Sequence, residues 1–391
     1  MKKITLLSLL FIPLFSSNVT YLNNIRESVG LNTLQENTSL KDAAQAHAKY
    51  LLNNHINSHY ENATHPYFVG KTPSSRVLKF GYPTKDVKEN ISTNAKTDKE
   101  SIDTLLSAIY HRFVFLDFHI DQVGIGIEKD NKNKDIKSAY VYDMGLSSIA
   151  KLCQEDFLTL EGEVYMQNIC KDDMKYIPKI TYKKAKDSIA KTNPKMILFP
   201  NVDATNVPTA FFDEKPNPMP GYKVSGYPIS ASLNPYYFKN IRLKKFRLYN
   251  NKGRMVRAKL FKYSNDPNKR LKPYEFAIIP LQRLDYDSDY SAYVEIITNK
   301  GKVKKRWKFH TKKFDKPLYI ITKQYTNINT TKQSIILYIK PRNRKDIIKN
   351  LHFKGQISLS FIDLNTIKVS DIKTDAVVYV GNKTIKIKKI N

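Results

Sequence analysis

The chain has 391 residues, of which 41% are hydrophobic, and a formal net charge of +29 at pH 7. This length suggests two to four domains, and the apolar content leaves room for sizeable cores. No segment beyond the N-terminal run is long and apolar enough to span a bilayer, so we expect no transmembrane segment after that run.

Residues 1–17 have the features of a signal peptide. Lys2 and Lys3 precede an apolar run, and Ser16 and Ser17 then offer small residues for cleavage. No Cys follows the run, which argues against a lipoprotein anchor. The alternative is an uncleaved N-terminal anchor. We therefore expect a secreted, periplasmic or cell-envelope protein.

The next segment, residues 18–150, mixes helices and strands. Apolar residues recur at helical spacing in its helices, and Thr97 with Glu100 forms a capping box. Val123, Ile125 and Ile127 alternate with glycines, as in a strand. We predict helices at 18–30, 38–52, 73–81 and from Thr97, with strands at 123–127 and 139–144. This pattern indicates an α/β unit of two or three layers.

Residues 151–195 form a predicted connector that contains both cysteines of the chain, Cys153 and Cys170. An exported chain meets an oxidising compartment, so a disulfide is the default expectation. The alternative is a pair of buried free thiols.

Short strand patterns recur from about Met196 and are separated by turn signals. We predict strands at 224–233, 241–249, 256–263, 276–280, 290–298 and 303–311, and further ones at 318–322, 334–339, 357–361 and 377–380. This rhythm is typical of a β-sandwich, so we assign residues 196–315 to an Ig-like sandwich and residues 316–391 to a small β-rich domain. The fold class is therefore α+β and multidomain.

The charge is divided unevenly along the chain. Residues 18–150 hold 15 Lys+Arg and 15 Asp+Glu, whereas residues 151–391 hold 48 and 21. Lys302, Lys304, Arg306 and Lys308 share one face of their predicted strand. Such a stripe suits an anionic partner such as an acidic envelope polymer or a membrane surface. The alternative is a solvated outer face.

Several ordered motifs of residues 18–150 resemble the CAP superfamily, the fold of the cysteine-rich secretory and plant pathogenesis-related (PR-1) proteins. The motifs are Leu22-Asn23-Asn24-Ile25-Arg26, Ala46-His47-Ala48, Ser58-His59-Tyr60-Glu61, Arg76, Gly81-Tyr82, Glu89-Asn90-Ile91, Ile109-Tyr110-His111-Arg112 and Val123-Gly124-Ile125-Gly126. The resemblance covers about a third of the chain and implies an α-β-α sandwich with a cleft lined by His and Glu.

Residue by residue, the resemblance places His59, Glu89 and His111 in that cleft, with Glu61 and Asn90 as further ligand-binding residues. The family's second Glu, in the helix before the second His, has no counterpart among residues 105–108. Two neutral imidazoles suit Zn²⁺ or another divalent metal, so His59 and His111 are the predicted metal ligands. The alternative is that His59 and Glu89 simply hydrogen-bond and stabilise the cleft.

These observations favour a non-enzymatic envelope protein that binds a small ligand or divalent metal in the cleft and an anionic partner through its basic β domains. The alternative is a metal-assisted hydrolase of peptide or ester bonds, with Glu89 as its catalytic base. Nucleic acid is disfavoured as a partner, because Trp307 and Phe309 lie on the opposite face of their strand from the basic stripe.

Overall fold

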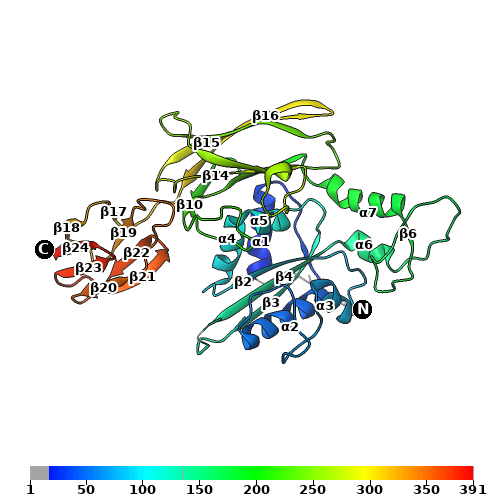
Figure 1. Ribbon diagram of the computed structural model, residues 1–391, viewed down its shortest axis with the longest axis horizontal. Helices are drawn as coiled ribbons and strands as arrows, with labels where there is room; N and C mark the ends of the chain where they lie inside the picture. Colours follow the sequence, from blue (N-terminus) through cyan, green and yellow to red (C-terminus); the bar gives the residue numbers. More distant parts are fainter. Residues whose placement is uncertain (1–16, 134, 391) are drawn as a thin grey trace, which may run out of the picture. The chain divides into compact units, whose positions relative to one another are not determined.

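The computed structural model describes residues 17–133 and 135–390, and its elements are drawn in Figure 1. The predicted signal peptide, residues 1–17, lies outside the described residues apart from Ser17. Two compact units are present. Unit 1 comprises residues 1–106 and 111–194, and unit 2 comprises residues 107–110 and 195–391. Unit 1 is mixed α/β, and unit 2 is almost entirely β.

Unit 1 is built on one four-stranded sheet. Its strand order is β1 (Gln35–Glu36), β3 (Gln122–Lys129), β4 (Ser138–Gly145) and β2 (Lys88–Thr93). The central strand β4 is buried along its whole length. The pairing of β4 with β2 sets Glu89 opposite Asp143, and this pairing brings the charged residues described below together.

Helix α2 (Thr38–Asn54) covers one face of this sheet (Figure 1). Asn37 caps it by accepting a hydrogen bond from the Leu40 amide at 3.1 Å. The helix lies so close to β3 that a Cβ on Gly124 would stand 2.0 Å from the Lys41 nitrogen, and one on Gly126 2.1 Å from the Ala44 carbonyl carbon. The alternating glycines of β3 are therefore required for this packing.

The other face of the sheet is covered by α4 (Asp98–Ser107) and α5 (Ile109–Phe115). Tyr142 on β4 lies on this face, where its hydroxyl contacts Ser101 of α4 and its ring meets Phe115 of α5 edge-on at 5.1 Å. Val141, the preceding residue, packs on the α2 side. Unit 1 thus has three layers, helix on sheet on helix. The sequence pattern does not separate α5 from α4; between them, Arg112 donates to the Leu106 carbonyl at 2.6 Å and thereby satisfies an end of α4.

The remaining helices of unit 1 flank this core. They are α1 (Ser17–Ser28), α3 (Pro73–Lys79), α6 (Ser147–Leu152) and α7 (Lys179–Thr192), and a small ribbon joins β5 (Tyr165–Met166) to β6 (Ile177–Pro178). Cys153 and Cys170 form the predicted disulfide. In the described part of the chain, no helix is long and apolar enough to cross a membrane.

Unit 2 begins with two four-stranded sheets and a short ribbon, β9 (Ala210–Phe211) with β10 (Ser225–Gly226). One sheet has the order β13 (Ala258–Lys262), β14 (Glu275–Pro280), β11 (Ile229–Leu233), β7 (Met196–Phe199). The other has the order β12 (Arg242–Asn250), β15 (Asp289–Thr298), β16 (Gly301–Thr311), β8 (Ala204–Val207). As predicted, Trp307 and Phe309 of β16 are buried and its lysines are exposed.

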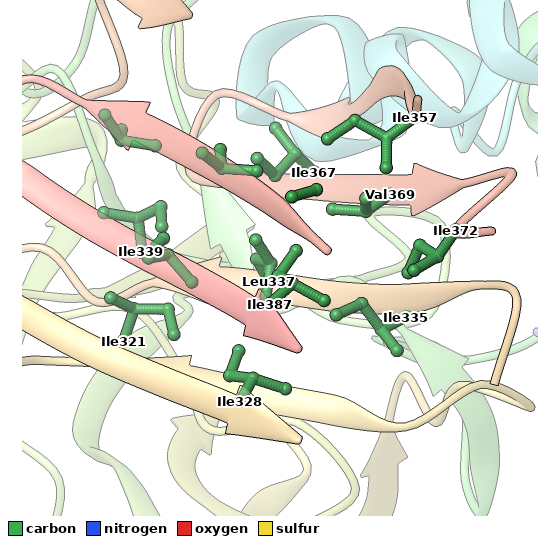
Figure 2. Packing of buried hydrophobic residues seen from close by; sticks show 14 of the residues in the cluster. Ile321, Ile328, Ile335, Leu337, Ile339, Ile357, Ile367, Val369, Ile372 and Ile387 are labelled. Carbon is green, nitrogen blue, oxygen red and sulfur yellow. The ribbon is translucent and has the colours of Figure 1, made fainter. Parts of the chain in front are cut away.

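Two further four-stranded sheets complete unit 2. One is ordered β17 (Leu318–Ile321), β19 (Ile335–Ile339), β22 (Thr366–Ser370), β21 (Ser358–Asp363), and the other β18 (Tyr325–Thr330), β24 (Lys383–Lys389), β23 (Ala376–Val380), β20 (Leu351–Lys354). Both sheets contribute to one isoleucine-rich core, whose side chains gather between the strands in Figure 2. Each sheet therefore has one face on this core and one face away from it.

The predicted strands of the C-terminal half largely coincide with observed strands, but β7, β8, β9, β18, β20, β22 and β24 were not predicted. The Ig-like assignment of residues 196–315 stays a prediction.

Candidate functional site

His59 and Glu89 form a hydrogen-bonded pair at the edge of the unit 1 core. Glu89 lies on β2, and His59 lies in the loop after α2. His59 Nδ1 and Glu89 Oε1 are 2.8 Å apart; the Glu89 side chain is 1% exposed, whereas that of His59 is 43% exposed. Because Nδ1 faces a carboxylate, the geometry leaves Nε2 as the nitrogen directed away from the pair. Within the described residues, this nitrogen forms no hydrogen bond.

Arg76 of α3 contacts both members of this pair. Its Nη2 donates to Glu89 Oε2 at 2.6 Å, and its Nη1 donates to the carbonyl oxygens of His59 at 3.2 Å and Gly70 at 3.3 Å. The guanidinium is fully buried. Helix α3 starts with a capping box between Thr72 and Ser75, which fixes the turn that carries Arg76. One cation therefore positions both the Glu89 side chain and the His59 backbone.

Glu61 and His47 form a second buried pair beside the first. His47 Nδ1 lies 2.8 Å from Glu61 Oε1, and its Nε2 lies 3.0 Å from the Ser58 carbonyl oxygen. Both ring nitrogens therefore face oxygen atoms of the protein. Glu61 Oε2 accepts from the amides of Val69 at 2.7 Å and Gly70 at 3.1 Å. Glu61 is therefore buried and fully engaged, and His47 is a buried histidine of the core.

The charges of this site shift the pKa values of its carboxyl groups in opposite directions. Burial raises the pKa of Glu89, but the His59 hydrogen bond and the charges of His47 and Arg76 outweigh it, so the net pKa is lowered. Burial also raises the pKa of Glu61. The His47 hydrogen bond, two backbone amides and the Arg76 charge outweigh this effect, so the net pKa of Glu61 is lowered. Asp143 differs: burial and the neighbouring Glu89 charge raise its pKa well above the usual range. We call these residues the Glu89 cluster: His47, His59, Glu61, Arg76, Glu89 and Asp143.

Asn90, the residue after Glu89 in β2, bonds to the His111 backbone. Asn90 is fully buried on β2, and its Nδ2 donates to the His111 carbonyl oxygen at 2.9 Å. His111 is half-buried on α5. The hydrogen bond from Asn90 is thus to the backbone of His111 and not to its ring. Both carboxylates of the predicted site, Glu61 and Glu89, lie below the surface.

The donor set of the site decides whether it fits a metal ion. Protein zinc sites use at least three His, Cys, Asp or Glu ligands. Within residues 17–133 and 135–390, no group of three or more such residues is placed to hold a metal ion. The orientation of His59 by Glu89 resembles that of a metal-ligating histidine, but the third ligand is lacking. The described residues therefore do not fit a zinc site of the usual kind.

Sequence reasoning identified His59, Glu61, Glu89, Asn90 and His111, and the structure places His59, Glu61 and Glu89 within one region held together by Arg76, whereas Asn90 bonds to the His111 backbone. It did not assign a role to Arg76, and it missed Asp143. A signal for Asp143 exists, because it is the only charged residue within the apolar run of β4. The role of Arg76 depends on contacts between α3 and β2, which no local pattern reports.

Comparisons with known proteins identify a family for part of the chain. Residues 19–143 match the model of the cysteine-rich secretory protein family, CAP. A comparison with curated proteins finds no match.

Solved structures show limited likeness to this chain. An outer surface protein from Borrelia burgdorferi is 20% identical, with a TM-score of 0.29, over 33% of this chain and 88% of that one. An extracellular SCP-domain protein from Bacillus anthracis is 21% identical, with a TM-score of 0.28, over 33% of this chain and 39% of that one. The fibronectin(III)-like modules of Clostridium thermocellum CbhA are 10% identical, with a TM-score of 0.17, over 50% and 93%. Such low scores say nothing about what this chain binds.

The ordered motifs and the family match lead to the same segment, and most of the chain after it is β-structure. Residues 19–143 therefore form a CAP domain of the cysteine-rich secretory protein family.

Proposed function

We propose that this chain is an exported, non-enzymatic CAP-domain protein that binds a small ligand at His59. The observation that carries the proposal is the arrangement of His59: its Nδ1 is tied to the buried Glu89, and its ring is 43% exposed. A histidine held in this way offers Nε2 to a ligand in a fixed direction, because the carboxylate sets both tautomer and ring orientation. Arg76 supports this arrangement by fixing the Glu89 side chain and the His59 backbone.

Of the two occupants that the sequence leaves open, the geometry favours a small ligand over a divalent metal held by His59 and His111. The reason is the donor set, which in the described residues lacks a third metal ligand. The hydrolase alternative is weaker as well. Both oxygens of Glu89 are engaged, by His59 and Arg76, and a lowered pKa makes a carboxylate a poor general base.

The test compares the full chain with His59→Ala and with His55→Ala as a matched control, since His55 is also half-exposed but outside the cluster. Ligand-observed NMR with a library of small carboxylic acids, amides and sugars should identify compounds that bind wild type and His55→Ala but not His59→Ala. If every compound binds all three proteins equally, the proposal is wrong.

A Zn²⁺ titration of the same proteins separates the two occupants. Stoichiometric, tight Zn²⁺ binding that is lost in a His59→Ala/His111→Ala double variant would mean that the site binds a metal rather than a small ligand. Turnover of ester or peptide substrates that disappears in Glu89→Gln would support the hydrolase instead.

We further propose that the basic β region binds an anionic polymer or membrane surface at the cell envelope. Its support is the outer face of β12, β15 and β16, where strand pairing places Arg247, Tyr293 and Arg306 in one row. The Arg306 guanidinium lies 5.4 Å from the Tyr293 ring centre, and lysines continue this face along β16. Retention on an acidic matrix should be lost at about 1 M salt, where the screening length is roughly 3 Å. It should also be lost in Lys304→Glu/Arg306→Glu. Retention that survives both changes would contradict the electrostatic proposal.

A further inference from the structure

The outer face of the C-terminal sheet is hollowed. The hollow has a volume of about 490 Å³, and we call it the Lys386 hollow. Its polar lining comes from three of the four strands of the sheet and from the turn before β23. The side chains that matter here are Asn327, Asn329, Lys354, Asp375, Lys386 and Lys388.

Strand register explains why these side chains share one face. Asn327 pairs with Lys386, Lys386 with Val377, and Val377 with Lys354, so they form one row across β18, β24, β23 and β20. The intervening residues, such as Ile328 and Ile387, point into the core, where Figure 2 shows them among the isoleucines. Because strands alternate their side chains between two faces, the polar row is held outward by the burial of its apolar neighbours.

Gly355 closes one end of the hollow. Its φ is +102°, and a Cβ there would stand 2.8 Å from the Asp375 carbonyl oxygen. Only glycine adopts this conformation readily and lets the β20–β21 turn approach β23 so closely. The turn therefore places Lys354 and Asp375 on the rim of the same hollow.

The cationic groups of the hollow are not neutralised by the protein. Lys354, Lys386 and Lys388 make no ion pair or side-chain hydrogen bond within the described residues, and all three are exposed. Asp375 is the one acidic side chain of the lining, and one of its oxygens already accepts from the Lys389 amide at 2.8 Å. The site thus carries an excess of positive charge together with free amide groups from Asn327 and Asn329.

A second row of the same face adds aromatic surface. This row crosses the same four strands two residues before or after the row that contains Lys386. Its members are Tyr325, Thr384, Tyr379 and His352. Tyr325 is 69% exposed. At roughly 4.8 Å between strands, each row is about 14 Å long. A row that holds two tyrosines and a histidine therefore adjoins the cationic hollow.

We propose that the Lys386 hollow binds an acidic oligosaccharide, that is, a chain of sugar rings that bear carboxylate or sulfate groups. The ammonium groups would take the anionic substituents. Asn327, Asn329 and Asp375 offer acceptors that need donors, which sugar hydroxyls supply and a bare sulfate ion does not. The tyrosines supply an apolar face for the rings. This site is formed by residues other than His59 and other than the β16 face, so it goes beyond the proposed function.

The test uses the full chain and four probes in isothermal titration calorimetry. They are a heparin-derived hexasaccharide, an oligogalacturonate of the same length, neutral maltohexaose and an oligothymidine of matched charge. We expect the two acidic sugars to bind, with maltohexaose at least tenfold weaker. The heparin and galacturonate arms distinguish sulfate from carboxylate as the anionic group. Tighter binding of oligothymidine than of both acidic sugars would overturn the assignment to a sugar, as would no binding of either acidic sugar.

Matched variants locate the site. Lys354→Glu/Lys386→Glu should weaken the acidic sugars at least tenfold, whereas Lys332→Glu/Lys340→Glu changes the same charge in the same part of the chain outside the lining and should weaken them less than twofold. Asn327→Ala should weaken them without any change in charge. Circular dichroism should be unchanged in all of them, because the altered residues are exposed.

These variants also separate this inference from the proposed function. If only Lys304→Glu/Arg306→Glu weakens binding of the acidic sugars, the Lys386 hollow is not their site. The proposal of an anionic partner at the β16 face would then still stand. If Lys354→Glu/Lys386→Glu and Lys332→Glu/Lys340→Glu weaken the acidic sugars equally, the assignment to the hollow is also wrong. Binding would then depend only on the net charge of the chain.

Discussion

The Glu89 cluster and the Lys386 hollow use charged side chains in opposite ways. In the cluster, Arg76 and Glu89 are buried and bonded to each other and to neighbouring groups. In the hollow, Lys386 and its two lysine neighbours are exposed and have no partner among the described residues. The first site contains its own counter-charges, whereas the second leaves its charges to something outside the chain.

This difference shows that buried charges determine the geometry of a site, whereas exposed charges are available to provide affinity for a partner. A buried charge must be paired, because the loss of hydration costs several kcal/mol. Pairing fixes the orientation of each member, and in the cluster it leaves one exposed group, the His59 ring. An exposed charge costs little and is screened by salt, so it adds little to stability and remains available for binding.

The largest effect is expected from Arg76→Met. This change removes the cation between Glu89 and Glu61 and leaves their charges buried, which should destabilise unit 1 by about 3–5 kcal/mol. Hydrogen exchange of amides within residues 19–143, followed by mass spectrometry, reports unit 1 directly. The only tryptophan of the chain, Trp307, lies in unit 2, so its fluorescence transition should move much less.

Arg306→Met is the control for this prediction. Arg306 is exposed and contacts the Tyr249 and Tyr293 rings at 5.3 and 5.4 Å, so its loss should cost below about 1 kcal/mol. If the two substitutions destabilise the protein equally, the contrast between buried and exposed charges does not hold.

Glu89→Gln and Asp143→Asn should change stability with opposite dependence on pH. The pKa of Glu89 is lowered in the folded protein, so its charge stabilises the fold above its ordinary pKa of 4.5, and this stabilisation is lost as the pH falls through the folded value. Glu89→Gln should therefore destabilise by about 2 kcal/mol at pH 7 and by progressively less below pH 4.5.

The pKa of Asp143 is raised, so wild type is favoured below the ordinary value of 3.8 and loses that advantage as the pH rises toward the folded value. Among the described residues, neither carboxyl oxygen of Asp143 accepts a hydrogen bond from a donor, and the neighbouring carboxylate is that of Glu89. Asp143→Asn should then be about neutral in acid and gain about 1–3 kcal/mol relative to wild type at higher pH. Urea unfolding at several pH values measures both variants, and parallel pH profiles for the two would contradict this account.

Much of the CAP domain could be predicted from the sequence because its signals are local. The motifs around His59 and Glu89 are contiguous, the capping residues of α3 and α4 adjoin their helices, and the glycines of β3 alternate visibly. The pairing of β2 with β4 is not local, so the approach of Asp143 to Glu89 could not be derived. The sequence predicts a ligand-binding role for Glu61. Its burial against His47 could not be derived, because it depends on the fold.

The C-terminal hollow escaped prediction for a related reason. Strand β18 carries Asn327 and Asn329 on its outer face, and asparagine is depleted in strands. In β24 isoleucine alternates with lysine, a pattern that indicates a strand with one buried and one solvated face. Register across four strands, which turns scattered polar residues into rows, is information that only the structure supplies.

The smallest effect is expected from Lys386→Gln, and its sign is informative. Lys386 has no counter-charge in the described structure and shares the hollow with Lys354 and Lys388. Removing it should relieve repulsion and stabilise unit 2 by no more than about 0.5 kcal/mol at low salt. Trp307 fluorescence in urea measures this change, and the gain should vanish at about 1 M salt because the repulsion is screened. A loss of stability that persists at high salt would mean that Lys386 packs or pairs within the chain, and its charge would then belong with those of the Glu89 cluster rather than with a binding surface.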